Sequence, residues 1–532
     1  MTPTSSPNPG PTTVLRAPGL VLHLDADGTV ASVAGPAAAS PWLHGCGALL
    51  VTGVDGPLVL GAPRVAVDVD EVEVARSGGG LSTVVRHSVE QGWAVRVVLA
   101  NETDAELALT DVRLTWRAAP GTVVTALAAG ARAAYAVQAE DGDGPVLLGS
   151  LRSGAQPGVD PEGLLLGPLV LAPHHRWAVS WRWEVVPDAR RAVVADLPRT
   201  TWFDRGQTAV LPGGPDVAVV APGLVVEPED DRVEVTADEP GAYRVELRAA
   251  RGTTALPLTW APDLDDLVDV TVAALLAGPT TPGGTVRLDG ATAGLVVQDA
   301  LARRSGGDPD ALGDALELLA GALADALDDG PDGGTGGGAP DPATLALLSR
   351  EADRSGDAAL LDVATRHLLA TTAAVPGLGL AGVGIALARV RSGRPATDVV
   401  AHLAGLRAVA VDPSRRGVAG LELELLLRPR DAEAGPAVLA GLRRLGAWLG
   451  AGLPGRVVPP LAPDVLAHAA TLLGLVDEPT GQRLQGAWGV TASELARRSA
   501  AEVRARLVDG GGGPTSDPVS RRALATLVLG RP

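Results

Sequence analysis

The sequence has 532 residues, is 46% hydrophobic and carries a formal net charge of −18 at pH 7. A chain of this length is too long to fold around one hydrophobic core, so we expect about three domains. The acidic balance argues against a nucleic acid or an anionic membrane surface as a partner.

The residue types that are missing exclude several chemistries. The chain has no lysine and one isoleucine, a bias typical of a high-GC bacterial genome. Without lysine it cannot form a Schiff base or a P-loop. Cys46 is the only cysteine, which excludes an intrachain disulfide and cysteine-rich zinc or iron–sulfur sites. We therefore expect no metal and no cofactor, and we expect the Cys46 thiol to be a small buried apolar group.

The first residues, MTPTSSPNPGPTT, contain neither the basic region nor the apolar run of a secretory signal. We expect residues 1–13 to be disordered and the protein to be cytoplasmic. A longer uncharged run at 368–388 contains Pro376 and four glycines. Two buried helices that meet at a turn explain this run better than a membrane span does.

Residues 14–195 predict a large antiparallel β-sandwich, because short alternating apolar runs are broken by Gly, Pro, Asp and Asn. Within it, residues 92–116 predict a hairpin with a turn that begins at Asn101. The parity of the apolar residues changes on the return strand, which predicts a β-bulge near Thr110 and Asp111.

Three of the ten tryptophans lie in HHRWAVSWRWEVV, residues 174–186. Trp177, Trp181 and Trp183 have one parity on a strand, and Arg182 has the other. Because charged side chains mark the solvated face, we expect the rings to pack in the core rather than to form an exposed platform for a sugar.

Residues 196–260 contain a second group of short strands. Val233 and Val235 alternate with polar residues before an Asp-Glu-Pro-Gly turn, and Val245 and Leu247 do so after it. This pattern predicts a small immunoglobulin-like β-sandwich.

From residue 263 to residue 530 the apolar period becomes that of a helix. Asp308 and Asp341 each precede a proline, which is typical of an N-cap followed by the first helical residue. We expect about a dozen helices, arranged as helical hairpins in an all-α, (α/α) toroid-like domain. Residues 328–342, rich in Gly and Asp, predict a flexible loop.

No motif by itself defines a catalytic site. GLGLAG at 377–382 matches a dinucleotide fingerprint, but helices are expected on both sides, so its glycines indicate close helix packing and a tight turn. Glu422 and Glu424 lie in an apolar run, and on a helix only one of them can face inward, where burial could tune it as an acid or base. Arg428 and Arg430 offer surface ion pairs as the simpler explanation.

Aromatic and polar residues at turns are the candidates for substrate contact, namely Trp42, His44, Trp202 and Asp204. Packing between domains is the alternative explanation for Trp202 and its neighbour Phe203. The histidines include no pair with the spacing of a helical zinc site, so no metal ligand is assigned.

Two helical segments resemble known families. DRSGDAALLDVATRHLL at 353–369 resembles the helix–turn–helix segment of six-hairpin glycosidases, in which a Ser-Gly-Asp or Thr-Gly-Asp turn precedes the next helix. GLGLAGVGIALARVRSG at 377–393 is similar to the Gly-rich hairpin of lanthionine-synthetase C-like toroids. With its β-then-α order, the chain resembles bacterial glycoside hydrolases and phosphorylases that join a β-supersandwich to an (α/α) toroid.

The chain also departs from these families. The zinc ligands of the lanthionine cyclases have no counterpart, since the one cysteine lies in the other half of the chain. The sugar subsites of toroid glycosidases are lined with tryptophan and tyrosine, whereas the helical half here has only Trp448 and Trp488 among its aromatic residues.

The resemblance implies a carbohydrate-enzyme-like architecture, so we expect a protein that binds glycans or is a degenerate glycoside hydrolase. The alternative is a non-enzymatic interaction or scaffold protein, and the expected partner is accordingly a carbohydrate or a protein. Carboxylates with an aromatic ring in the toroid mouth would favour an enzyme. A mouth lined with Ala, Leu and Gly would favour the alternative.

Overall fold

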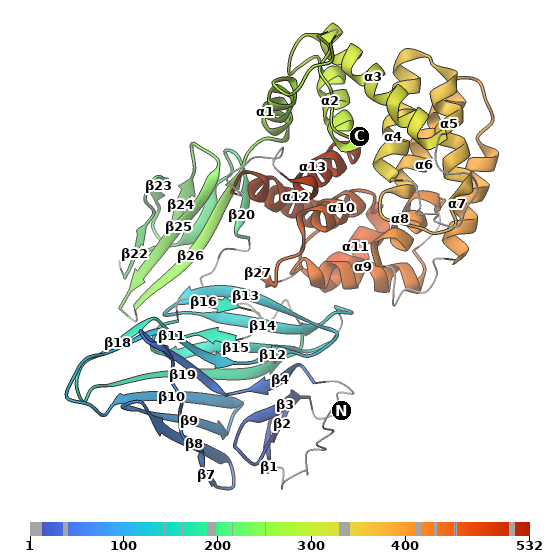
Figure 1. Cartoon of the computed structure of the whole chain (residues 1–532). Coiled ribbons are helices and arrows are strands. Elements are labelled where there is room, and N and C mark those ends of the chain that lie inside the picture. The colour runs from blue at the N-terminus through green and yellow to red at the C-terminus, as the bar shows by residue number, and fades with distance from the viewer. Residues whose placement is uncertain are drawn as a thin grey trace, which may run out of the picture.

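Strands fill the first half of the chain and helices fill the second half in the computed structural model (Figure 1). The predicted order of β-sandwich domains followed by an all-α domain is confirmed. The structure describes residues 13–35, 41–142, 144–156, 158–160, 163–188, 198, 200–214, 216–250, 252–282, 284–328, 341–409, 417–429, 434–451, 453, 455–509 and 517–531. The predicted disorder of residues 1–13 and the predicted flexible loop at 328–342 fall largely outside the described residues, but Thr13 begins the first strand, and Asp328 and Pro342 lie in helices.

The large β-sandwich consists of three antiparallel sheets around one core. Its strands are β1 (Thr13–Ala17), β2 (Leu20–Leu24), β3 (Val30–Ala34), β4 (Leu43–Cys46), β5 (Leu49–Gly53), β6 (Gly56–Pro57), β7 (Arg64–Val67), β8 (Glu71–Gly78), β9 (Leu81–Val89), β10 (Trp93–Asn101), β11 (Leu107–Thr115), β12 (Arg117–Ala118), β13 (Thr122–Gly130), β14 (Ala134–Ala139), β15 (Val146–Ser153), β16 (Gly158–Asp160), β17 (Gly163–Leu165), β18 (Leu169–Leu171) and β19 (Arg176–Val186). The long sheet has the order β13-β14-β15-β19-β10-β9-β8-β7, and the smaller sheets are β1-β2-β3-β4-β12 and β16-β17-β11-β5-β6. Apolar side chains from all three sheets pack together.

Aromatic rings form the centre of this core. Trp181 and Trp183 are 1% and 3% exposed, as the parity of the sequence predicts. Trp183 stacks on Trp93 with 5.6 Å between ring centroids, and Trp181 stacks on Tyr135 at 5.2 Å. Trp177 is only partly buried and lies at the margin of the core.

The predicted hairpin at 92–116 is wrong, because β10 and β11 lie in different sheets. β10 pairs with β9 and β19, whereas β11 pairs with β5, β17 and β18. The side-chain amide of Asn101 donates hydrogen bonds to the carbonyl oxygens of Ala105 and Leu171, which fixes the crossover between the sheets. The predicted bulge is confirmed, since the register of β11 against β5 shifts between Leu109 and Asp111.

The small β domain is a second sandwich with its own core. Its strands are β20 (Trp202–Asp204), β21 (Ala209–Pro212), β22 (Val217–Val220), β23 (Val225–Pro228), β24 (Arg232–Thr236), β25 (Gly241–Ala249) and β26 (Gly252–Ala261). The sheet β21-β24-β23 faces the sheet β22-β25-β26, and Val235, Val245 and Leu258 are fully buried between them. The start of β26 also pairs with the end of β13, so the second sheet continues into the long sheet of the large sandwich.

The helical domain closes into a ring. Its helices are α1 (Leu264–Leu276), α2 (Ala291–Arg303), α3 (Pro309–Asp328), α4 (Pro342–Ser355), α5 (Ala358–Ala370), α6 (Leu378–Arg391), α7 (Thr397–Val409), α8 (Gly417–Leu427), α9 (Pro436–Trp448), α10 (Pro463–Gly474), α11 (Glu478–Trp488), α12 (Ala492–Asp509) and α13 (Pro518–Leu529). Along the series α2, α4, α6, α8, α10, α13 each helix packs against the next, and α13 packs against α2. Outer helices such as α5 and α7 cover this inner ring (Figure 1), so the domain is an (α/α) toroid.

The helix boundaries follow the predicted capping signals. The Asp341 side chain accepts a hydrogen bond from the backbone N–H of Ala343, and Asp308 does the same for Asp310. The uncharged run at 368–388 forms the end of α5, a turn and α6, as predicted. Among the described helices, none combines the length and the apolar content that a membrane span requires.

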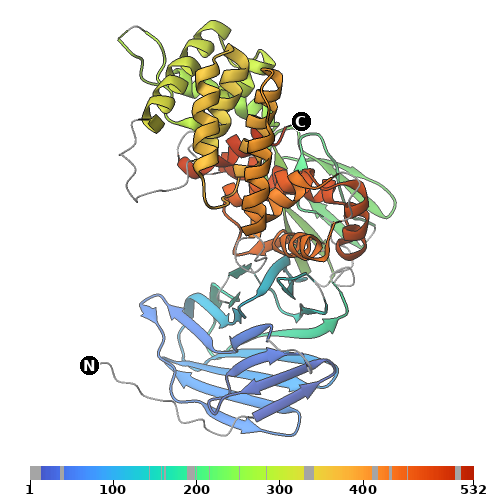
Figure 2. The ribbon, with the colours of Figure 1, turned by 90° about the vertical axis from the view of Figure 1, so that its right-hand side faces the viewer.

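Two short strands attach the helical domain to the β domains. β27 (Arg456–Val458), between α9 and α10, pairs with β13 of the large sandwich. β20 pairs in parallel with β26 and packs against α12. Figure 2 shows the helical domain next to the large sandwich, with the small β domain beside it.

Candidate functional site

A pocket of about 530 Å³ lies at one mouth of the toroid. Five inner helices begin at this pocket, since its lining includes residues from the first turns or N-caps of α2, α4, α6, α8 and α10. The sixth inner helix, α13, contributes side chains from its middle and its end. A volume of roughly 300–1,000 Å³ is usual for a small-molecule site.

Hydrogen-bonding side chains from several inner helices line this toroid pocket. The polar lining residues are Thr292, Asp341, Asp464, His468, Arg522 and Thr526. Arg522 Nη1 lies 3.8 Å from Asp464 Oδ2, and its side chain is 59% exposed. The remaining lining is apolar, with small residues such as Ala343 and Ala525. The pocket can therefore bind both hydroxyl groups and apolar C–H faces.

A buried carboxylate supports the wall of the pocket. Glu422 of α8 is fully buried, and its two oxygens accept hydrogen bonds from the backbone N–H groups of Gly377 (2.8 Å) and Leu380 (2.7 Å) at the start of α6. His468 Nε2 of α10 lies 2.8 Å from Glu422 Oε2, at the distance of an ion pair but without the alignment of a hydrogen bond. Glu422 therefore links three inner helices and positions the imidazole of His468 in the pocket wall.

The sequence predicts surface ion pairs for Glu422 and Glu424. Among the described residues an arginine lies near Glu424 but not near Glu422. Glu424 is partly exposed and lies 3.7 Å from Arg407. Arg430, one of the two arginines expected to pair with these glutamates, lies outside the described residues. Arg428 instead pairs with Asp477. Among the described residues no arginine pairs with Glu422, because it faces into the ring, where the N-terminus of α6 satisfies the carboxylate.

The glycines of GLGLAG serve helix packing. Gly377 has φ +90° at the start of α6, and a Cβ atom on Gly379 would lie 2.8 Å from Glu422 Oε1. A Cβ atom on Gly382 would lie 2.8 Å from the side chain of Leu403. The motif follows helix α5 rather than a strand, so it lacks the context of a dinucleotide site.

Trp42 and His44 lie in the large sandwich and do not line the toroid pocket. Trp42 is 6% exposed within the core, and half-buried His44 pairs with Arg117 across β4 and β12. Their role as substrate contacts stays a prediction.

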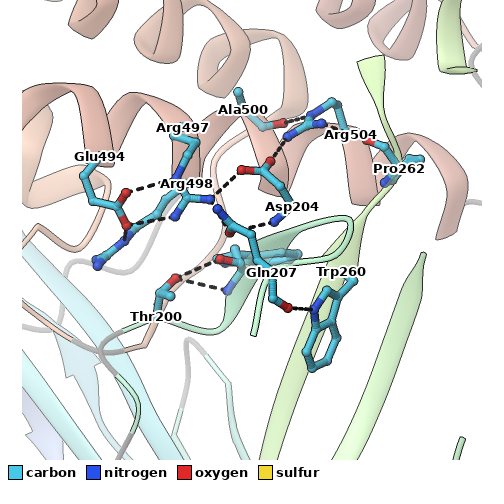
Figure 3. Close-up of polar contacts among 11 residues, drawn as sticks. Thr200, Asp204, Gln207, Trp260, Pro262, Glu494, Arg497, Arg498, Ala500 and Arg504 are labelled. Atoms are coloured by element: carbon cyan, nitrogen blue, oxygen red, sulfur yellow. Dashed lines mark hydrogen bonds and ion pairs between the residues drawn. The ribbon is translucent and has the colours of Figure 1, made fainter. Parts of the chain in front are cut away.

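Asp204 and Trp202 lie on β20, which packs against α12. Figure 3 shows Asp204 beside the arginines of α12. Asp204 forms ion pairs with Arg497, at 2.6 Å, and with Arg504. The side-chain oxygen of Gln207 accepts hydrogen bonds from the Asp204 backbone and from Arg497. These contacts join β20 to α12, and Asp204 is not among the residues that line the toroid pocket.

A cavity of only about 30 Å³ lies beside Trp202 at this junction. The guanidinium of Arg456 stands 4.3 Å from the centre of the Trp202 ring. Burial raises the pKa of Glu502 in the cavity wall, and the charges of Arg506 and Arg456 act in the opposite direction. Such a cavity has room for about one water molecule, and not for a sugar.

Sequence reasoning did not find Asp464, His468 or Arg522. The available signal was the order of the helices, since alternate helices of a toroid begin at the same mouth and polar residues near their starts gather there. Within the described part of the chain, no group of three or more His, Cys, Asp or Glu side chains could hold a metal ion.

The fold and the pocket together define a two-part architecture, a β-sandwich part joined to an (α/α) toroid with a polar mouth. Among solved structures, a polysaccharide lyase matches with a TM-score of 0.69 at 12% sequence identity, covering 92% of this chain and 93% of that one. The expected resemblance to carbohydrate-active enzymes is thus confirmed at the level of the fold.

Other comparisons are much weaker. A family 81 glycoside hydrolase from Clostridium thermocellum matches with a TM-score of 0.21 and 10% identity, covering 97% of this chain and 84% of that one, and such a score is too low to indicate a shared fold. No protein-family model and no curated protein matches the sequence.

Proposed function

We propose that this chain is a carbohydrate-active protein that binds a neutral glycan in the toroid pocket. The pocket of about 530 Å³ at the starts of five inner helices carries this proposal. Asp341, Asp464 and Arg522 supply acceptors and donors for sugar hydroxyls, and the small apolar residues suit the C–H faces of a sugar ring. The shared fold with a polysaccharide lyase agrees with a carbohydrate ligand and does not indicate its charge.

The charges around the pocket favour a neutral glycan over an acidic one. Asp341, Asp464 and Glu422 contribute three carboxylates, and Arg522 contributes one cation. The N-terminus of each helix adds roughly half a positive charge. Five helix N-termini and Arg522 therefore offset the carboxylates without leaving a large positive excess for a uronate chain.

Glycan-array screening followed by calorimetry tests the proposal. We expect the purified chain to bind uncharged oligosaccharides, and Asp464→Asn to raise the Kd at least about tenfold through loss of a charge-assisted hydrogen bond. Asp398→Asn is the matched control, because Asp398 pairs with Arg389 at 2.9 Å and does not line the pocket. Binding of acidic glycans alone, or equal effects of the two variants, would refute the proposal.

Cleavage of the bound glycan is a second candidate function, and the Glu422–His468 pair favours it. A histidine beside a buried carboxylate can accept a proton, because the carboxylate stabilises the imidazolium that forms. In a hydrolysis, His468 would take the proton of the attacking water and, as the imidazolium, return it to the leaving oxygen, so the protons balance without a further acid. We expect His468→Gln to abolish the release of new reducing ends while calorimetry still detects binding.

The non-enzymatic alternative also has an observation in its favour. Among the described lining residues of the toroid pocket there is no tryptophan, tyrosine or phenylalanine. Trp488 is buried in the helical core, and Trp448 lies at the junction with β20. A lining without aromatic rings is expected if the toroid mouth binds a protein partner rather than a glycan.

A further inference from the structure

A second cavity, the cleft, lies between the two β domains rather than in the toroid. Its volume is about 530 Å³, and it shares no residue with the toroid pocket. It forms where β13 of the large sandwich pairs with β26 of the small domain. The cleft lining is Ala129, Gly130, Ala155, Gln156, Leu166, Pro168, Leu169, Trp177, Arg244, Glu246, Arg248, Thr253 and Ala255.

The cleft lining includes Trp177 of β19. Its neighbours on β19, Trp181 and Trp183, are buried in the core, whereas Trp177 is partly exposed. A partly exposed indole with polar groups around it provides an apolar plane for the C–H face of a sugar. The strand that packs two tryptophans into the core thus presents the third at the cleft.

The small β domain contributes charged side chains to the cleft lining. Arg244, Glu246 and Arg248 alternate on β25, so they share one face of this strand, while Val245 and Leu247 pack into the core. Glu246 lies 3.4 Å from the guanidinium of Arg244 and 3.0 Å from that of Arg248. The one carboxylate leaves a net positive charge in the cleft, although the chain as a whole carries −18.

A buried acceptor without a donor also lines the cleft. Gln156 is fully buried, and its amide nitrogen donates hydrogen bonds to Tyr135 Oη and to the carbonyl oxygen of Gly158. Its Oε1 atom has no hydrogen-bond partner among the described residues. Because a buried polar atom is normally satisfied, this oxygen needs a donor such as a ligand hydroxyl or a water.

We propose that this cleft binds an acidic sugar unit, with Trp177 stacked on the pyranose ring and Arg244 and Arg248 bound to its carboxylate or sulfate group. Arginine is suited to this role because its planar fork binds such anions through two parallel hydrogen bonds. A neutral glycan in the toroid pocket and an acidic unit in the cleft are separate sites, so either can exist without the other.

Calorimetry with three probes tests the cleft. The probes are an oligogalacturonate, a sulfated galacto-oligosaccharide and the same galacto-oligosaccharide without sulfate. We expect one or both acidic probes to bind, and binding to weaken as the ionic strength rises. Carboxylate and sulfate recognition are distinguished by which acidic probe binds more tightly. Equal binding of the uncharged probe would overturn the acidic class, and no binding of either acidic probe would overturn the site.

Variants locate the binding. Arg248→Gln should raise the Kd of the acidic probe about tenfold, and Trp177→Leu should do so while keeping an apolar side chain. Arg232→Gln is the matched control, because Arg232 pairs with Glu229 and Glu234 on the other sheet of the small domain. Thermal unfolding checks that Trp177→Leu folds. If it does not fold, Arg248→Gln still tests the site, because Arg248 is exposed and its replacement removes no core side chain. An unchanged Kd in Arg248→Gln would overturn the proposal.

The proposals for the toroid pocket and for the cleft can be refuted independently. Asp464→Asn alters only the toroid pocket, so it should leave the affinity for the acidic probe unchanged. Acidic binding that is lost in Asp464→Asn and kept in Arg248→Gln would place the acidic ligand in the toroid and overturn the cleft proposal.

Discussion

Asp204 of β20 and Arg497 of α12 are 293 residues apart in the sequence, and 2.6 Å separates Oδ2 from Nη1 (Figure 3). The other oxygen of Asp204 contacts Arg504, whose side chain is 10% exposed. One carboxylate thus pairs with two arginines of the same helix. This carboxylate joins β20 to the helical domain.

We predict that Asp204→Ala lowers the free energy of unfolding by about 3 kcal/mol, because it leaves Arg504 largely buried without its carboxylate. Denaturant unfolding followed by circular dichroism measures this loss. The control is Arg205→Ala, since Arg205 is 49% exposed and pairs with Asp266 at the surface, and its cost should stay below about 1 kcal/mol. Similar losses in the two variants would show that the junction is no more than a surface ion pair.

The tryptophan strand gives a second prediction. Trp181→Ala should destabilise the protein by about 3–5 kcal/mol, because the ring is 1% exposed and its removal leaves a large cavity. Arg182→Ala, on the opposite face of the same strand, should cost less than about 1 kcal/mol. Urea unfolding midpoints compare the two. If Trp181→Ala kept the parent midpoint and lost affinity for a glycan, the ring would be a ligand platform rather than core.

Features set by neighbouring residues could be predicted from the sequence. Asp308 and Asp341 cap helices because a side-chain acceptor reaches backbone N–H groups two residues away. The bulge between Leu109 and Asp111 follows from a change of parity along a single strand. Such signals need no knowledge of what the strand or helix packs against.

Pairing and the site could not be predicted in the same way. Alternation shows which face of a strand is buried, and this face is the same whether β10 and β11 pair in one sheet or lie in two. The contact between Glu422 and His468 arises only when α8 and α10 become neighbours in the closed ring. Spacing along the chain carries no information about that neighbourhood.

Stability should depend on pH through His87. Burial lowers the pKa of this histidine from 6.5 to about 4, and its Nδ1 accepts a hydrogen bond from Trp93 Nε1 at 3.3 Å. Between these two pH values the unfolded chain binds a proton that the folded chain does not. The free energy of unfolding therefore falls as the pH decreases through this window, by about 3 kcal/mol in total.

Urea unfolding at several pH values from neutral to about 4 measures this dependence. His87→Gln removes the titrating group and keeps an acceptor for Trp93, so its stability should fall less steeply than that of the parent. The slope of His87→Gln is compared with that of His174→Gln, in which a histidine that is 64% exposed receives the same replacement. Identical slopes for His87→Gln and the parent would show that His87 does not titrate in this window.

Gly379 gives a last prediction, which tests the support of the toroid pocket. An added Cβ atom would lie 2.8 Å from Glu422 Oε1, the oxygen that accepts the hydrogen bond of Leu380. We expect Gly379→Ala to cost about 1–3 kcal/mol through overpacking, although alanine favours a helix by about 1 kcal/mol over glycine. Gly405→Ala is the matched control within α7, because a Cβ atom there meets open space, and it should leave stability unchanged or raise it by about 0.4–1 kcal/mol. Calorimetric unfolding compares the two variants, and a gain in stability for Gly379→Ala would mean that Glu422 is not held against α6.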